Sequence, residues 1–473
     1  MQRAYLLLAL LISMRFLAAA QHVTLKISVR GVFQSKVTLT PLVGAKPGRP
    51  LVTTPFVDPN QAITIDVDSQ YLPGEFILRF DYKLAKSSSP YPAEKNILIY
   101  RQNLSLSVNP PFCNNPDSTR FDDDETENTI LRRFTAENAK KRAMVSLLQN
   151  FLLKYDDINT VLYEEAMEEY ERRRIAYNDW VAEQIHEHAY TFASRVFAFE
   201  YIHETAWRGN LTTRIQSMAD HYFDSMDFAD TLMIRTREAT EWMNNYVNLY
   251  GSLATDMRTR DSLVCLAGRN AIEKARSGNP RFYGWMVDYF FNGFETNQIN
   301  SGLLMLGPYL KDSSCLTSKR LAINQRISGI QNLRPGSLAP DFTLRDANGR
   351  LVQLSHYPCD CRYKLVLFWA AGCDHCKVLL DKLYPMWRQI SSQRLVQVFA
   401  LGLDESEEDV ARWKTMTDRL KGWKHVRCIG GVNSKEASAY FVLSTPTMYL
   451  IDGVTNRIIS SPESAGQLFD AIR

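Results

Sequence analysis

Residues 366–376 have the sequence VLFWAAGCDHC, and this stretch decides the fold of the last third of the chain. It opens with a short apolar run, which is typical of a buried strand. The run breaks at Ala371-Gly372, and Cys373 and Cys376 follow, three residues apart, at the predicted start of a helix. Unpaired N–H groups and the helix dipole stabilise a thiolate at that position. The second cysteine lies one turn further, close enough to form a disulfide with the first.

His375 stands between the two cysteines. A positive charge or a hydrogen bond from this residue would lower the pKa of the Cys373 thiol. The same cysteine spacing is also that of half a zinc site. The buried strand before the pair, and Thr445-Pro446 later in the chain, favour dithiol chemistry over zinc binding.

The composition is that of a folded, water-soluble protein of several domains. The 473 residues are 45% hydrophobic and 23% charged, and this length predicts two to four domains. The formal net charge of +3 is close to neutral for a chain of this size. Composition therefore predicts no nucleic-acid partner.

The first 20 residues have the outline of a secretory signal peptide. Arg3 precedes the apolar run 4–12, and Ala18-Ala19-Ala20 offers small residues for cleavage before Gln21. No later stretch approaches roughly 18 uncharged apolar residues, so we expect no membrane span in the mature chain. The sequence predicts a periplasmic or secreted protein.

The chain has eight cysteines, and an exported chain enters an oxidising compartment. This favours the redox interpretation of Cys373 and Cys376 over zinc binding. Cys265 and Cys315 are candidates for a disulfide with each other, although sequence does not determine connectivity. Cys359-Asp360-Cys361 has three interpretations: a structural pairing, which we favour, a second redox pair that relays electrons, or partners for other cysteines. The sequence also leaves open whether Cys113 and Cys428 form disulfides, and with which partners.

Three folded regions follow the predicted signal peptide, and together they predict a multidomain α+β protein. Residues 21–115 alternate between apolar and polar types, which predicts an antiparallel, sandwich-like β domain. Residues 116–333 change to the helical period and predict an all-α domain. There His186 and His188 are two residues apart and lie on different sides of a helix, so we expect no metal site.

Residues 334–473 alternate between strands and helices, which predicts an α/β domain. A hairpin is expected across the Asn348-Gly349 turn. The central strand and the two cysteines come next, and Ser406 with Asp409 resembles a capping box that opens a helix to about residue 421.

Residues 336–473 resemble the thioredoxin-like superfamily, and within it the exported TlpA/ResA-like thiol–disulfide oxidoreductases. The matching residues are Ala339-Pro340-Asp341-Phe342, the motif from Phe368 to Cys376, and Ser444-Thr445-Pro446-Thr447 before an apolar strand. The order of the three domains is also similar to that of multidomain envelope proteins of Bacteroidetes.

The resemblance implies a thioredoxin-like fold and a role for each matched residue. Cys373 would be the exposed nucleophile and Cys376 the resolving thiol. Pro446 would be a cis-proline that lets the Thr445 backbone lie beside Cys373 and pair with an extended substrate. Trp369 would support the active site from beneath, and we also expect it to be one of the substrate-binding residues.

The chain also departs from the family pattern. Thioredoxins carry a buried acid at the position of Leu367, and ResA-like proteins carry one at the position of Leu379. Without either acid, proton transfer from Cys376 is left to His375, Lys377 or water. The histidine resembles that of oxidising DsbA-type motifs and favours a low Cys373 pKa.

The leading hypothesis is an enzyme, a protein-thiol oxidoreductase that needs no cofactor beyond its own dithiol. Its partners would be protein thiols and disulfides of the envelope and a redox partner protein. A thiol peroxidase is disfavoured because Ala370 stands where a Thr or Ser is expected, three residues before Cys373. The alternative from another class is an envelope binding or scaffold protein, or a metallochaperone, with a thioredoxin-like domain.

Overall fold

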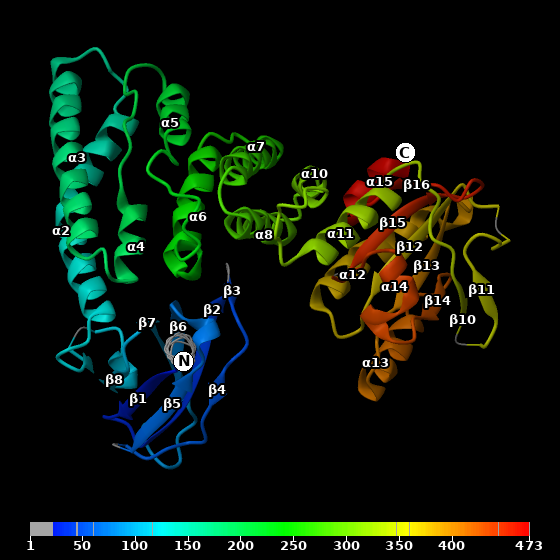
Figure 1. Ribbon diagram of the computed structural model, residues 1–473. Coiled ribbons are helices and arrows are strands. Elements are labelled where there is room, and N and C mark those ends of the chain that lie inside the picture. The colour runs from blue at the N-terminus through cyan, green and yellow to red at the C-terminus, as the bar shows by residue number, and fades with distance from the viewer. Residues whose placement is uncertain are drawn as a thin grey trace, which may run out of the picture. The chain divides into compact units, whose positions relative to one another are not determined.

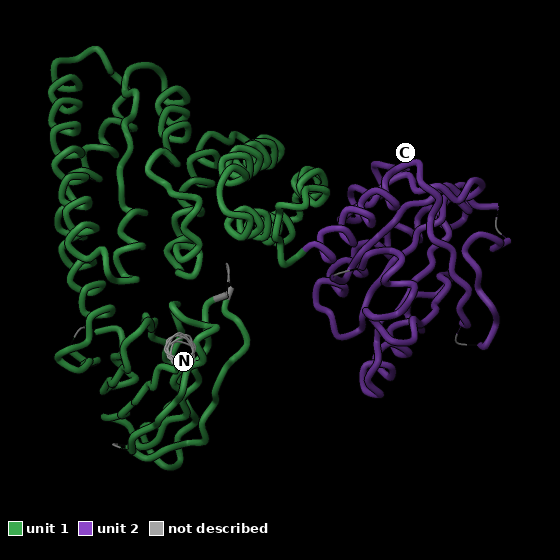
Figure 2. Tube along the Cα trace, viewed as in Figure 1, with its two compact units in different colours: residues 1–319 green, residues 320–473 purple. Residues whose placement is uncertain are grey.

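The computed structural model describes residues 22–43, 46–59, 61–115, 117–346, 348–358, 360–442 and 444–472. The chain divides into two compact units, residues 1–319 and 320–473 (Figure 2). The first unit contains a β-rich part followed by helices, and the second alternates strands with helices (Figure 1). The predicted signal peptide, residues 1–20, lies outside the described residues.

Two sheets form the β-rich part of the first unit. One has the strand order β5-β1-β8-β9, and the other has the order β3-β2-β6-β7, with β4 paired to β2. Apolar residues that alternate along both sheets, such as Leu25 and Leu78, share one hydrophobic core. The strands are β1 (Val23–Val29), β2 (Gln34–Val43), β3 (Lys46–Pro47), β4 (Val52–Thr53), β5 (Ala62–Val67), β6 (Gly74–Lys83), β7 (Tyr91–Ile99), β8 (Leu104–Val108) and β9 (Thr119–Phe121).

One strand pair in this part is parallel, which corrects the expectation of an antiparallel domain. β1 pairs with β8 in parallel, from Leu25 opposite Leu104 to Val29 opposite Val108. Between these two strands the chain builds the whole second sheet and then returns. A parallel pair needs such a long connection, whereas a hairpin gives only antiparallel strands.

A buried asparagine joins the β-rich part to the first long helix. The Asn128 side chain accepts a hydrogen bond from the Leu98 N–H at 2.8 Å and donates one to the Leu98 carbonyl at 2.9 Å. Leu98 lies in β7, and Asn128 is the second residue of α2. One side-chain amide therefore satisfies both backbone groups of Leu98. These groups lie on the side of β7 where no other strand pairs with it.

Helices make up the rest of the first unit. α2 and α3 pack along each other through residues such as Leu152 and Tyr163. Several helices begin at a polar cap, for example Asn210 for α5 and Asp256 for α7. The helices are α2 (Glu127–Lys154), α3 (Val161–Glu187), α4 (Ala193–Phe197), α5 (Leu211–Asp220), α6 (Arg237–Gly251), α7 (Met257–Arg276), α8 (Pro280–Thr296), α9 (Asn300–Met305) and α10 (Gly307–Leu310).

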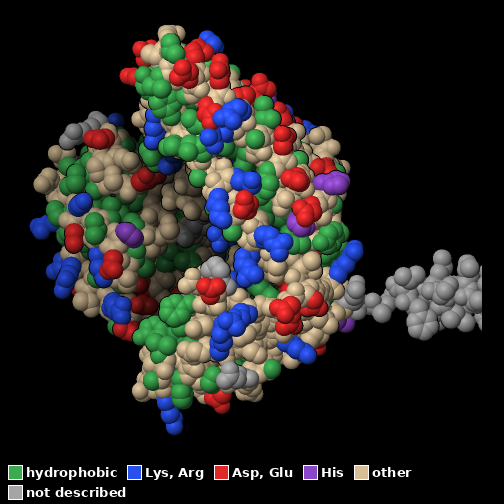
Figure 3. Space-filling view, turned by 90° about the vertical axis from the view of Figure 1, so that its left-hand side faces the viewer, with side chains coloured by type: hydrophobic (Ala, Val, Ile, Leu, Met, Phe, Trp, Pro, Cys, Tyr) green, Lys and Arg blue, Asp and Glu red, His purple; other side chains and the backbone are tan. Residues whose placement is uncertain are grey.

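The surface charges are mixed. On the face that Figure 3 shows, Lys and Arg side chains are interspersed with Asp and Glu side chains. None of the helices in the described ranges is both long enough and apolar enough to cross a membrane.

A five-stranded sheet with the order β14-β13-β12-β15-β16 is the centre of the second unit. β12, β13 and β14 run parallel, and β15 is antiparallel to β12. The hairpin β10–β11 forms as its turn chemistry predicted. The elements are α11 (Arg320–Asn332), β10 (Thr343–Arg345), β11 (Leu351–Gln353), β12 (Tyr363–Trp369), α12 (Asp374–Ile390), β13 (Val396–Gly402), α13 (Glu407–Thr417), β14 (Lys424–Arg427), α14 (Lys435–Ala439), β15 (Thr447–Asp452), β16 (Ile458–Ser460) and α15 (Ala465–Ile472).

Both faces of this sheet are covered, and β12 is buried along its whole length. Leu365 and Leu367 face a core that includes residues of α12, α13 and α15. Val366 and Phe368 face a second core with residues of the β10–β11 hairpin and of α14. A strand buried on both faces is continuously apolar, which explains the run that the sequence shows.

α11 belongs to the second unit, although it lies before residue 334. Its Gly329 approaches the ring of Phe441 so closely that a Cβ atom would overlap the ring. Leu333, just after this helix, lies in the same core as Phe368. α13 ends at Thr417 rather than near residue 421, although its Ser406 cap accepts a hydrogen bond from the Asp409 N–H as expected.

Candidate active site

The two motif cysteines lie where the central strand turns into a helix. β12 ends at Trp369, and α12 begins at Asp374 with Cys373 as its N-cap residue. The Cys373 sulfur accepts a hydrogen bond from the Cys376 N–H at 3.2 Å. A sulfur at the open end of a helix therefore takes the place of the oxygen that usually caps it, and the unpaired N–H groups favour its ionised form.

The two thiols differ in exposure and in acidity. Cys373 is partly exposed, whereas Cys376 is completely buried. Burial opposes ionisation of Cys373, but hydrogen bonds from the Cys376 thiol and from backbone N–H groups outweigh it and lower the pKa of Cys373. Burial and the hydrogen bond to Cys373 raise the pKa of Cys376 to about 12. The site therefore has one accessible, acidic thiol and one shielded thiol.

The loop before β15 brings backbone to the first thiol. The Cys373 thiol donates a hydrogen bond to the carbonyl oxygen of Thr445 at 3.3 Å. The Thr445–Pro446 peptide bond is cis, as the resemblance implies. Both loop residues are partly exposed, so a molecule that reaches Cys373 also meets this stretch of backbone.

Trp369 has no exposed surface. It lies in the core that contains Cys376 and Leu380, directly beneath the dithiol. A residue without exposed surface cannot contact a client protein. The structure thus corrects its placement among the substrate-binding residues and leaves it the supporting role.

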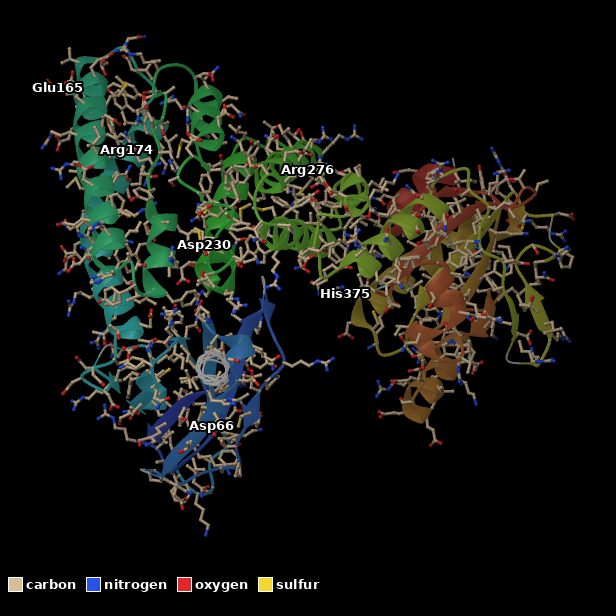
Figure 4. The ribbon with its side chains drawn as sticks, viewed as in Figure 1. Asp66, Glu165, Arg174, Asp230, Arg276 and His375 are labelled. Carbon is tan, nitrogen blue, oxygen red and sulfur yellow. The ribbon has the colours of Figure 1, made fainter. Side chains whose placement is uncertain are left out.

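His375 lies on the surface at the start of α12 (Figure 4). The part of this residue that lowers the pKa of Cys373 is its backbone N–H group. Its neighbour Asp374 forms an ion pair with Lys377 at 2.9 Å, and this pairing lowers the pKa of Asp374. The backbone N–H of residue 375 therefore helps to lower the Cys373 pKa because of its place in the helix. This effect does not depend on which side chain stands at position 375.

A buried carboxyl group lies behind the dithiol, although both family positions for one are apolar. Leu367 and Leu379 are buried in the same core as Cys376. Asp404, which follows β13, is 4% exposed and accepts a hydrogen bond from the Ala371 N–H at 2.8 Å. Sequence reasoning missed it, although an acid just beyond a buried parallel strand next to the cysteine-bearing strand was the available signal.

Among the other described cysteines, Cys113, Cys265 and Cys315 belong to the first unit, and Cys361 and Cys428 belong to the second. Cys265 and Cys315 are not joined by a disulfide, which corrects the suggested bond between them, and Cys113 and Cys428 are not disulfide-bonded either. Cys361 is disulfide-bonded, whereas Cys359 is outside the described residues. Cys361 precedes β12, and the seven residues of that strand, at roughly 3.3 Å each, put about 20 Å between it and the dithiol. Cys361 and Cys373 are therefore too far apart for a direct exchange within one folded molecule.

Within the described ranges, no group of three or more His, Cys, Asp and Glu side chains is arranged to hold a metal ion.

Comparison with known proteins identifies similar chains for the second unit. Residues 335–456 match the AhpC/TSA family. Thiol-disulfide oxidoreductase ResA of Bacillus subtilis is 25% identical over 152 residues, which are 31% of this chain and 79% of ResA.

Solved structures from Bacteroides are also similar. A thioredoxin-like protein from Bacteroides caccae is 17% identical, with a TM-score of 0.39, and the match covers 57% of this chain and 96% of that one. The thioredoxin domain of a thiol-disulfide oxidoreductase from Bacteroides vulgatus is 25% identical, with a TM-score of 0.26, over 30% of this chain and 96% of that one.

The strand–turn–helix placement of the dithiol and the cis-proline loop agree with the family match and with the similarity to ResA. The C-terminal unit of this chain is thus a thioredoxin-like domain similar to ResA, and the proteins that it resembles are named thiol-disulfide oxidoreductases.

Proposed function

We propose that this chain is an exported protein-thiol oxidoreductase that exchanges disulfides with extracytoplasmic client proteins. Its reactive group is the Cys373–Cys376 pair, and it uses no other cofactor. The observation that carries the proposal is the difference between the thiols: the pKa of the accessible Cys373 is lowered, and that of the buried Cys376 is raised to about 12. An acidic, reachable thiolate with a shielded thiol beside it is what stepwise disulfide exchange requires.

The reaction with a client disulfide has two steps. The Cys373 thiolate attacks one client sulfur, which forms a mixed disulfide and releases the other client sulfur as a thiolate. Cys376 then loses its proton and attacks the Cys373 sulfur, which releases the second client thiolate and leaves the Cys373–Cys376 disulfide. Two electrons pass from the protein to the client, and the released thiolates take up two protons. The reverse sequence oxidises a client dithiol.

A client would be held by backbone as well as by sulfur. The partly exposed Thr445 and Pro446 lie beside Cys373, where an extended client segment could add to the chain as a short strand. A redox partner protein would restore the dithiol or the disulfide after each turnover. The predicted signal peptide supports a location of both reactions outside the cytoplasm.

The direction of electron flow is tested by the reduction potential of the pair. The full chain is equilibrated with glutathione buffers, and the redox state of the Cys373 and Cys376 peptides is quantified by mass spectrometry. The lowered Cys373 pKa favours the reduced form, so we expect a potential in the oxidising range, about −120 to −180 mV. A value near about −270 mV would indicate a reductant instead.

A trapping variant tests the enzyme itself. Cys376→Ser should accumulate the mixed disulfide with a model client, because the second step is blocked, and Cys373→Ser should form no adduct. If the wild-type pair never cycles between dithiol and disulfide, the proposed function is rejected.

A further inference from the structure

Asp404 follows β13 at the carboxyl end of that strand, and the dithiol follows the carboxyl end of the neighbouring strand β12. β13 runs parallel to β12, with Trp369 opposite Gly402. The pairing continues beyond the last strand residue, because the Leu403 N–H donates to the Trp369 carbonyl at 2.9 Å. The next residue, Asp404, is thereby placed beside the turn that follows Trp369.

The carboxyl group makes one buried contact with that turn. Its Oδ1 accepts the Ala371 N–H at 2.8 Å, and Ala371 and Asp404 are 1% and 4% exposed. Its Oδ2 is buried and has no hydrogen-bond partner among the described residues. A buried backbone N–H needs an acceptor, and in this place a side chain from the next strand supplies it.

The turn that Asp404 holds is hydrogen-bonded to the Cys373 backbone and to the Cys376 thiol. The Cys373 N–H donates to the Ala370 carbonyl at 3.2 Å, which sets the entry into α12. The Ala370 backbone also forms a hydrogen bond that lowers the pKa of Cys376, against the larger effect of burial. Displacement of the Ala370–Ala371 peptide would therefore move the groups that surround both thiols.

We infer that Asp404 is a positioning residue of the dithiol: the hydrogen bond from the Ala371 N–H to its Oδ1 holds the turn that places the Cys373 sulfur at the first N–H groups of α12. This inference rests on the proposed function, since it concerns the same pair of thiols. The buried carboxyl group beside the dithiol turn then comes from Asp404, two residues beyond the end of β13, while leucines stand at positions 367 and 379, where the resemblance implies an acid.

The surroundings of Asp404 favour a role through the hydrogen bond over a role through charge. Burial raises the pKa of Asp404, the Ala371 N–H opposes this shift, and the carboxylate of Asp409 adds to it. Arg427 attracts the charged form. Asp409 and Arg412 of α13 also approach Gly372 in the same turn. An amide oxygen can accept the Ala371 N–H as a carboxylate oxygen does, so asparagine should serve at this position.

Three variants of the full chain separate these roles. Asp404→Asn keeps the acceptor and removes the charge, and Asp404→Leu removes the acceptor at similar size. Glu405→Gln is the matched control, because it neutralises the adjacent, exposed carboxylate. Each protein is alkylated with iodoacetamide across a pH series, with the Cys373 peptide quantified by mass spectrometry, and a separate, unalkylated sample of each protein is equilibrated with glutathione. Circular dichroism checks folding, and Asp404→Ala replaces the leucine variant if that variant does not fold.

Loss of the acceptor should weaken the stabilisation of the Cys373 thiolate. We expect Asp404→Leu to move the midpoint of alkylation up by about one pH unit and the glutathione equilibrium about tenfold toward the disulfide. Asp404→Asn and Glu405→Gln should stay close to wild type. The inference is overturned if the leucine variant matches wild type, or if asparagine shifts the midpoint as far as leucine does. The alkylation profile needs no redox cycling, so a wild-type pair that does not cycle would reject the proposed function without deciding this inference.

Discussion

The Cys373 sulfur lies 3.3 Å from the carbonyl oxygen of Thr445, although 72 residues separate them in the chain. The antiparallel pairing of β12 with β15 produces this contact, because Phe368 lies opposite Thr447. The end of one strand therefore meets the start of the other at the same edge of the sheet. A slip of one residue in this register would turn the buried side chains of β15 to the other face.

The first prediction concerns selective alkylation of the active-site thiols. At pH 8 iodoacetamide should label Cys373 and leave Cys376 unmodified, because only the thiolate reacts and the pKa of Cys376 is about 12. The alkylation rate at Cys373 should rise with pH and then level off. The midpoint of this rise should lie below 9.0, the ordinary pKa of a cysteine thiol. Mass spectrometry of the labelled peptides gives both results.

Cys428 is the internal control for that experiment. It is buried, and burial raises its pKa to about 12, so it should remain unlabelled for as long as the fold is intact. Equal labelling of Cys373 and Cys376 at pH 8 would contradict the difference between the two thiols.

The second prediction concerns Asp341, which ties the segment before β10 to β11 and to the residues just after that strand. Its carboxylate accepts hydrogen bonds from the Ser355 hydroxyl at 2.6 Å and from the Gln353 amide at 2.7 Å. Burial opposes ionisation, but these bonds outweigh it and lower the pKa of Asp341 below 3.8. Asp341→Asn should reduce the free energy of unfolding at pH 7 by roughly 1 kcal/mol, a small value because the site is exposed.

The pH dependence of that loss follows from the direction of the shift. The folded state favours the carboxylate, so its contribution is complete above the unfolded pKa and is lost as the pH falls through the folded pKa. The urea unfolding free energies of wild type and variant should therefore converge once the pH falls below the folded-state pKa of Asp341, which lies below its ordinary value. Asp381→Asn, at an exposed position of α12, is the control. A difference between wild type and Asp341→Asn that does not shrink in acid would contradict the assignment.

The third prediction concerns the packing of α11 on the second unit. Gly329→Ala would drive a methyl group into the Phe441 ring and should lower the free energy of unfolding by about 1–3 kcal/mol. Urea unfolding of a fragment spanning residues 320–473 measures it. For the same reason, a fragment that begins at residue 334 should be less stable than one that begins at residue 320.

A second glycine in the same unit provides the comparison. Gly466 lies in α15, where a Cβ atom would meet only the Ser464 hydroxyl at 3.8 Å. Gly466→Ala should be neutral or stabilising, since alanine favours a helix by up to about 1 kcal/mol over glycine. If both alanine variants behave alike, α11 does not depend on the close contact.

Local patterns were sufficient to predict the elements around the dithiol. The apolar run of β12, the Ala371-Gly372 break and the Asn348-Gly349 turn each encode their conformation within a few neighbouring residues. The resemblance to thioredoxin-like proteins is confirmed by the family match over residues 335–456 and by the similarity to ResA. A buried strand that ends in a glycine turn before a cysteine leaves few alternatives for the chain.

Contacts between distant segments were decided only by the tertiary structure. The sequence by itself determined that a strand, a turn and a helix would present Cys373 and Cys376, because periodicity and turn chemistry act over short distances. It did not determine that Trp369 is fully buried, that Asp404 holds the Ala371 N–H, or that β1 pairs in parallel with β8. Each of these depends on which strands become neighbours and in which register, and that choice is made by the packing of the whole core.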